Sequence, residues 1–223
     1  MIKKLQTVRN LRQKVYESIR DFVVSNELPP GSKINEDALA GDLGVSKTPV
    51  REALSKLAHD GIVEIIPNRG AFKVKLSRED ISEIMLIREA TEGLCIRLAA
   101  RNVTTKVIKK LKSVVDEFDE NELDRDLSRY PEADLRFHKI IYDLSNSTRL
   151  IRLIENYFYL THMLRLQYFR NPERVKRSLK GHRELIDALE KRDGELAEKI
   201  LKKILRSVCN YLTENASGNQ IFL

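Results

Sequence analysis

The sequence predicts a mainly α-helical protein in two parts, with one β-hairpin in the N-terminal part. Apolar residues recur at helical spacing over most of the 223 residues. Residues 62–76 are the exception, because apolar and polar residues alternate there as they do in strands. From Ser77 onward no such alternation returns. We therefore expect one domain over residues 1–76 and an all-α helical bundle over residues 77–223.

Three helices are expected before the hairpin. The first, over residues 8–26, has apolar residues along one face and stops at the breaker of residues 28–31. Asn35 is the expected N-cap of the second helix, and Gly44 is its C-terminal stop. The third helix starts three residues later, near Lys47, and runs to Gly61.

The order of these elements indicates a particular motif. Two helices joined by a three-residue turn form a helix-turn-helix, and a hairpin after it forms a wing. The wing strands are joined by residues 67–70, and Lys33-Ile34 are expected as a short extended pair. The N-terminal domain is therefore predicted to be a winged helix-turn-helix.

The start of the third helix, in the segment VSKTPVREAL, carries unusual polar chemistry. Ser46 is expected at the N-cap with its hydroxyl on the free amides of the first turn, where Pro49 is tolerated. Lys47, Thr48 and Arg51 surround the same helix end. Long cations and short hydroxyls beside a positive helix end suit phosphates and base edges. This helix is therefore the candidate for insertion into a DNA groove.

Six amphipathic helices with short joints are expected in the C-terminal part, which is the pattern of a helical bundle. Breakers or caps separate them, and the last residues, 216–223, are expected to be a loose tail. The predicted helices cover residues 78–101, 105–123, 129–145, 147–170, 173–192 and 194–215.

Three polar residues fall on faces of this bundle that should turn inward. Asp134 and His138 lie four residues apart on one helix, and His182 lies beside apolar residues on a later one. Three such ligands can hold a divalent cation with positions left open. The alternative is an Asp–His hydrogen bond that joins helices, with His182 on the surface. Spacing alone leaves both interpretations open.

Composition and charge restrict the class of protein. The net charge of +7 and pI of about 9.3 are compatible with a polyanionic partner, and 13 Lys/Arg minus 9 Asp/Glu gives +4 for residues 1–76. No stretch has the length and apolarity of a membrane span or a signal peptide. Cys95 and Cys209 form no C-x-x-C motif, so we expect reduced thiols in a cytoplasmic protein.

The N-terminal segment resembles a known family. Residues 35–73, NEDALAGDLGVSKTPVREALSKLAHDGIVEIIPNRGAFK, resemble the winged helix-turn-helix of the GntR family of bacterial transcription regulators. Asp37 departs from the fatty-acid-responsive member of that family, which has an arginine there. The resemblance implies contacts with operator DNA from Ser46, Lys47, Thr48 and Arg51, and from a wing tip of Asn68, Arg69 and Gly70 in the minor groove.

The resemblance continues through the C-terminal half. Segments 86–100, 134–147 and 181–193 are similar to the FCD domain of the FadR branch, in its shorter, VanR-like, six-helix version. Many such domains bind Zn, Ni or a similar ion through D-x-x-x-H and two later histidines. Asp134, His138 and His182 match the first three ligands. The fourth position is occupied by Ile204, so three protein ligands with water or effector must suffice, or the site is lost.

The resemblance also implies an effector site. Arg88 lies where family members commonly direct an arginine into the effector cavity, and a buried guanidinium binds a small carboxylate bidentately. An ordinary surface ion pair between Arg88 and Glu92 is the alternative. Arg165 can serve as Arg88 does. His162 can replace the missing metal ligand or be a partly exposed helix residue.

We therefore expect a homodimeric, DNA-binding transcription regulator, most simply a repressor, which is not an enzyme. Its partners are a pseudo-palindromic operator in double-stranded DNA and a small carboxylate effector, with a divalent metal, Zn or Ni, in the bundle. Two rival classes remain at this stage. The Asp134 cluster could activate water in a metal-dependent hydrolase, or the chain could be a sequence-indifferent nucleoid protein.

Overall fold

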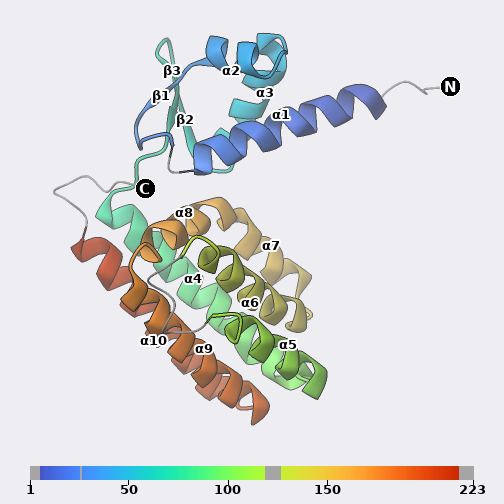
Figure 1. Ribbon diagram of the computed structural model, residues 1–223, viewed down its shortest axis with the longest axis vertical. Helices are drawn as coiled ribbons and strands as arrows, with labels where there is room; N and C mark the ends of the chain where they lie inside the picture. The colour runs from blue at the N-terminus through green and yellow to red at the C-terminus, as the bar shows by residue number, and fades with distance from the viewer. Residues whose placement is uncertain (1–5, 26, 119–126, 216–223) are drawn as a thin grey trace. The chain divides into compact units, whose positions relative to one another are not determined.

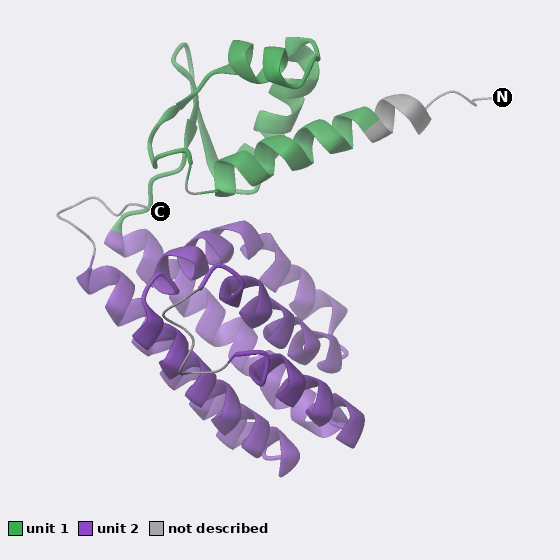
Figure 2. Cartoon of the chain, viewed as in Figure 1, with its two compact units in different colours: residues 1–77, 217–223 green, residues 78–216 purple. Residues whose placement is uncertain are grey.

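The computed structural model describes residues 6–25, 27–118 and 127–215 (Figure 1). The chain divides into two compact units, coloured separately in Figure 2. The first contains the described residues up to Ser77, and the second begins at Arg78. Nearly all regular structure is helical, which confirms the mainly α fold class. Within the described part of the chain, no helix is both long and apolar enough to cross a membrane.

The first unit is a winged helix-turn-helix, as predicted. The hairpin of β2 and β3 is present, and β1 pairs with β3, which makes an antiparallel sheet of order β1-β3-β2. That third strand is the expected extended pair. The elements are α1 (Gln6–Val24), β1 (Lys33–Ile34), α2 (Glu36–Asp42), α3 (Lys47–His59), β2 (Val63–Ile66) and β3 (Gly70–Lys73).

The core of this unit lies between α1 and α3, which pack against each other. Ile19 and Val23 of α1 are fully buried there, as are Leu54 and Leu57 of α3. Burying each such side chain contributes about 1.5–3 kcal/mol. This packing supports α3 from the side opposite its polar residues.

The turn between α2 and α3 follows the sequence prediction. The Asn35 side chain accepts hydrogen bonds from the backbone N–H groups of Asp37 and Ala38, at 3.0 and 3.1 Å. Gly44 has a φ of +62°, in the left-handed region that glycine adopts without a steric cost. These two devices start α2 and end it, so that α3 can begin at Lys47.

The second unit is an all-helical bundle. Its elements are α4 (Arg78–Ala99), the 3-10 turn η1 (Ala100–Asn102), α5 (Thr105–Val115), α6 (Tyr130–Leu144), α7 (Thr148–Asn156), α8 (Phe158–Tyr168), α9 (Pro172–Glu190) and α10 (Gly194–Glu214). Helix α4 contacts α6, α7 and α10, and α9 contacts α5 and α10 (Figure 1). Ile96, Phe137, Leu164 and Leu185 are among the residues fully buried between these helices.

Two helix predictions in this unit were wrong. The helix expected over residues 147–170 is divided at Tyr157, whose φ and ψ of −104° and 10° end α7 and begin α8. The division lets α7 pack against α4 while α8 packs against α6 and α10. The helix expected over residues 105–123 ends at Val115, and residues 119–126 lie outside the described part. The bundle therefore has seven α-helices among its described residues rather than six.

Candidate functional site

The residues predicted to contact DNA lie at the start of α3 and at the β2–β3 turn. Ser46, Lys47, Thr48 and Arg51 are all exposed. So are Asn68 and Arg69, while Gly70 is half-buried. All seven are therefore on the surface of the first unit, where a large ligand can reach them.

Ser46 does not form the predicted side-chain cap. Its backbone has the extended conformation of an N-cap, but its side chain makes no capping hydrogen bond. An N-cap hydroxyl accepts from the N–H of the second or third helical residue. Pro49 is the third helical residue of α3 and has no N–H, which removes one of these two donors. The Ser46 hydroxyl is consequently available to an external group.

Acidic residues of α2 hold both cations of the α3 start. The Lys47 Nζ lies 2.5 Å from Asp37 Oδ1, and the Arg51 Nε lies 2.7 Å from Glu36 Oε2. Lys47, Arg51 and Asp37 are more than half exposed, so water screens these pairs and each contributes little to stability. A phosphate or a base edge can therefore replace the carboxylates at small cost. Spacing did not predict this role for Asp37.

The wing turn has a fixed geometry. Asn68 and Gly70 have φ values of +62° and +106°, in the region that asparagine and glycine tolerate best. The Arg69 N–H donates to the Ile66 carbonyl at 3.0 Å. The Arg69 guanidinium lies 5.6 Å from the centre of the Phe72 ring. The turn thus presents a cationic side chain at the end of the hairpin.

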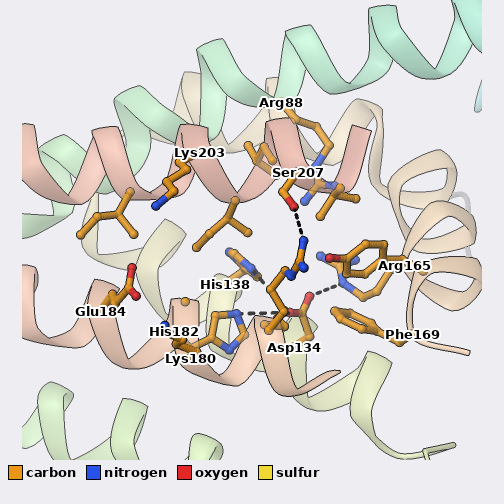
Figure 3. Close-up of a pocket in the computed structure, with 18 residues that line it drawn as sticks. Arg88, Asp134, His138, Arg165, Phe169, Lys180, His182, Glu184, Lys203 and Ser207 are labelled. Atoms are coloured by element: carbon orange, nitrogen blue, oxygen red, sulfur yellow. Dashed lines mark hydrogen bonds and ion pairs between the residues drawn. The ribbon is translucent and has the colours of Figure 1, made fainter. Parts of the chain in front are cut away.

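A second cluster lies inside the bundle. Asp134 and His138 project from α6 and His182 from α9, and each of the three offers a ligand atom within 4.8 Å of the others (Figure 3). Asp134 Oδ1 lies 3.2 Å from His182 Nε2 and 3.8 Å from His138 Nε2. His182 is only 3% exposed. The alternative was therefore wrong to place His182 on the surface, but the Asp–His contact that it expected between helices is present, from Asp134 on α6 to His182 on α9.

Arg165 of α8 is the strongest partner of Asp134. Its Nε lies 2.5 Å from Asp134 Oδ2, and the Ser178 hydroxyl donates to Oδ1 at 3.3 Å. Burial alone would raise the pKa of Asp134, but the Arg165 guanidinium and the two imidazoles hold it well below its usual range. Asp134 is thus ionised at neutral pH. An isolated arginine on a helix gave no sequence signal for this pairing.

The donor set fits a divalent metal ion. Burial lowers the pKa of His138 to about 4, which outweighs the attraction of Asp134, so its imidazole is neutral at pH 7. A neutral imidazole and an ionised carboxylate are the forms that bind metal. His162, on α8, does not belong to the cluster that the described residues form. It stacks on Phe158, and burial lowers its pKa to about 4.

Ile204 of α10 lies beside this cluster, at the position of the fourth family ligand. A Cβ atom added to Gly181 would lie 2.7 Å from Ile204 Cδ1, so the isoleucine packs closely on the α9 backbone next to His182. The side that a fourth ligand would occupy is therefore apolar. Three protein ligands are available here, and the Arg165 guanidinium competes with a metal for Asp134.

The cluster forms one wall of a cavity of about 290 Å³. Arg88 of α4 also lines it, and its Nε donates to Glu92 Oε1 at 2.6 Å. The predicted Arg88–Glu92 ion pair is therefore present, but it is buried rather than on the surface. The Arg165 Nη1 is buried and has no hydrogen-bond partner among the described residues. Arg165 lines the cavity, so an anionic ligand there can take up this unpaired donor after a small turn of the side chain.

Comparison with known proteins agrees with this architecture. Residues 11–72 match the family described as bacterial regulatory proteins, gntR family, and residues 83–207 match the FCD domain. A winged helix-turn-helix joined to such a bundle defines a DNA-binding transcriptional regulator, not an enzyme, so the hydrolase alternative is set aside. The chain belongs to the GntR family and carries a C-terminal FCD domain.

Individual relatives cover nearly the whole chain. It is 31% identical over 215 residues to the probable D-xylose utilization operon transcriptional repressor of Paenarthrobacter nicotinovorans, covering 95% of this chain and 93% of that protein. It is 26% identical over 205 residues to the transcriptional repressor RspR of Escherichia coli K12, covering 92% and 90%. The fold resembles that of E. coli McbR/YncC, with a TM-score of 0.77 at 23% identity over 92% and 97% of the two chains.

Proposed function

We propose that this protein is a homodimeric repressor that binds a pseudo-palindromic operator and responds to a small carboxylate. Residues 1–76 would bind DNA, and residues 77–223 would dimerise and bind the effector. The names of the relatives from P. nicotinovorans and E. coli support repression. The observation that carries the proposal is the exposed start of α3, where two cations are held by carboxylates that a phosphate can replace.

In this proposal α3 enters the major groove with its N-terminal end. Lys47 and Arg51 reach base edges or phosphates, and the hydroxyls of Ser46 and Thr48 contact the backbone. The wing tip of Asn68, Arg69 and Gly70 enters the adjacent minor groove. The absence of a side-chain cap on Ser46 supports this arrangement, because its hydroxyl makes no hydrogen bond to the helix amides and can bind a phosphate.

Substitution of Arg51 by alanine tests the DNA-reading helix. We expect a loss of about 1–3 kcal/mol in binding to an operator obtained by selection from random duplexes. Arg101→Ala, which removes an exposed arginine of the bundle, is the matched control. Binding to nonspecific duplex should change little in either variant. Equal losses for both substitutions, or a wild type that binds random duplexes as tightly as the selected site, would refute the assignment.

The proposed dimer surface is an apolar strip on α4. Leu86 is 67% exposed and Leu94 is 39% exposed, with exposed Ala90 between them at helical spacing. Helix α7 packs against α4 and adds Leu153, which is 51% exposed. Neighbouring exposed leucines are costly to leave in water and are typical of an interface. A two-fold pair of bundles would present two winged helices to two half-sites.

The proposed effector site is the cavity beside Asp134. Asp134, His138 and His182 would hold a divalent ion, Zn or Ni, which would supply a Lewis-acid anchor for a carboxylate oxygen. Arg88 and Arg165 would bind the same anionic group from the other helices. Arg88 lies on α4, which begins where the winged helix ends. A ligand that shifts α4 would therefore change how the two DNA-binding units are presented.

Metal analysis of the purified protein tests the ion. Zn or Ni should be present at up to one equivalent, or should bind on addition to chelator-treated protein, and should raise the melting temperature. His138→Ala should abolish both effects. His59→Ala, on α3, is the control and should leave them unchanged. If the wild type contains no metal and binds none on addition, the ion is excluded. The arginines would then remain as the effector site.

A further inference from the structure

The cavity in the bundle has cations at two separate places. Arg88 and Arg165 are 7% and 6% exposed and form its inner end. Arg177, Lys180 and Lys203 also line it, and all three are exposed to solvent. Figure 3 shows Lys180 and Lys203 on the side of the cavity away from Arg165. Five cationic side chains therefore line the cavity. Arg88 and Arg165 are each paired with a buried carboxylate, Glu92 and Asp134, so the unpaired positive charge lies at the outer end, where Glu184 also lines the cavity.

The outer cations differ from three of their neighbours on the same helices. Lys176 pairs with Glu173 at 2.8 Å, and Lys202 pairs with Glu198 at 2.7 Å. Arg206 likewise pairs with Glu89. No described carboxylate lies within 4 Å of the charged groups of the three cavity-lining cations, although Glu184 follows Lys180 by one helical turn. Arg177 donates a hydrogen bond of 3.2 Å to the Ser207 hydroxyl, and its charge adds to the effect of Lys176 in lowering the pKa of Glu173 one helical turn away.

Like charges gathered around one cavity repel each other, and an anion that binds among them removes this cost. At the inner end, Arg88 is paired with Glu92 and the Arg165 Nε with Asp134, and the Arg165 Nη1 is a buried donor with no partner among the described residues. An anionic group that enters this end can bind that donor when the Arg165 side chain turns toward the cavity. Lys180 and Lys203 are exposed at the outer end, so an anionic group bound at the buried inner end does not also pair with them. The two cationic ends therefore accommodate two anionic groups of one ligand.

The wall between the two ends is apolar. Ile200, Ile204 and Val208 repeat every four residues along α10, so they share one face of that helix, and all three line the cavity. Such a surface favours a hydrocarbon over a polyhydroxylated chain, because it offers no partners to hydroxyl groups. A volume of about 290 Å³ is at the lower end for a small-molecule pocket.

We infer that the effector is a short aliphatic dicarboxylate, with one carboxylate at Arg88 and Arg165 and the other at Lys180 and Lys203. This inference rests on the proposed function, because it specifies the ligand class of the same site. It assigns to the two lysines a role in selecting a dianion over a monoanion. It also gives Ile204 a role, as part of the surface that the hydrocarbon chain contacts.

Calorimetric titration of the full-length protein with matched acids tests this inference. Succinate, glutarate and adipate are compared with butyrate, pentanoate and hexanoate, with and without Zn. Each lysine should raise the affinity for the second carboxylate by about fivefold. We therefore expect the best dicarboxylate to bind at least tenfold more tightly than its matched monoacid. The double variant K180Q/K203Q should lose this preference while its affinity for the monoacid is unchanged. K199Q, which removes an exposed lysine on α10 outside the cavity, should behave as the wild type.

The possible failures are distinguishable. Equal affinity for diacid and monoacid, or a preference that survives in K180Q/K203Q, would overturn the dicarboxylate inference and leave carboxylate sensing intact. Tighter binding of 3-phosphoglycerate than of any dicarboxylate would overturn the assignment of the outer group as a carboxylate. If no acid of either series binds, carboxylate sensing itself fails.

Discussion

The buried pair of Arg165 and Asp134 allows a quantitative prediction about the stability of the bundle. Both side chains are about 5% exposed, and Arg165 Nε lies 2.5 Å from Asp134 Oδ2. Arg165→Met removes the cation but keeps most of the side-chain volume, so it leaves an ionised carboxylate buried without its main partner. Breaking a buried ion pair in this way costs about 3–5 kcal/mol. For a chain of this size that corresponds to a fall of about 6–20 °C in melting temperature.

The double variant Asp134→Asn/Arg165→Met should be more stable than the sum of the single changes predicts. Once the carboxylate is neutral, no charge is left unpaired, so we expect a coupling energy of about 2 kcal/mol. Urea unfolding in the presence of chelator measures all four members of the cycle without a contribution from metal. Arg136→Met is the control, because Arg136 pairs with Glu117 at 2.5 Å but its side chain is 48% exposed, and it should cost less than about 1 kcal/mol. A cost for Arg165→Met as small as that of Arg136→Met would show that the Asp134 charge is satisfied in some other way.

Two further predictions concern assembly and metal. Leu86→Glu should convert the dimer to a monomer in analytical ultracentrifugation, because it places a charge in the apolar strip of α4; Leu196→Glu, at a 39% exposed leucine of α10, should not. A wild type that sediments as a monomer would count against the dimer as well as its surface. Ile204→His should raise Zn affinity by about tenfold or more in a competition titration with a chelator, because it completes a set of four protein ligands; an unchanged affinity would mean that the residue-204 side chain does not reach the ion.

Local sequence rules determined most of the first unit. Asn35 and Gly44 bound α2 through their own cap and backbone geometry, and alternation over residues 62–76 produced the hairpin. These features depend on contacts within a few residues, so sequence spacing is enough to predict them. The side-chain cap predicted for Ser46 is absent for an equally local reason, because Pro49 lacks an amide N–H that the Ser46 hydroxyl could have accepted from.

The candidate metal ligands could be predicted from the sequence. The spacing of Asp134 and His138 places both on one helix face, and the family motif adds His182. Only the tertiary structure added Arg165, 31 residues from Asp134 in sequence, as the partner of that carboxylate. The break at Tyr157 that divides α7 from α8 has no breaker residue to announce it. The break follows from the packing of α7 and α8 on different helices. Local helix propensity does not include this packing energy, so the sequence pattern did not predict the break.

By itself, then, the sequence determined the order of elements, the polar and cationic start of α3 and the identity of the buried polar triad, because these depend on neighbouring residues and recurrent motifs. The tertiary structure decided which charges are paired. It paired Lys47 and Arg51 with carboxylates of α2 and buried the Arg88–Glu92 pair. It also placed Lys180 and Lys203 beside a cavity with no carboxylate of the described residues within 4 Å of their charged groups. Charge pairing depends on distance in space, and several helices must pack before those distances exist.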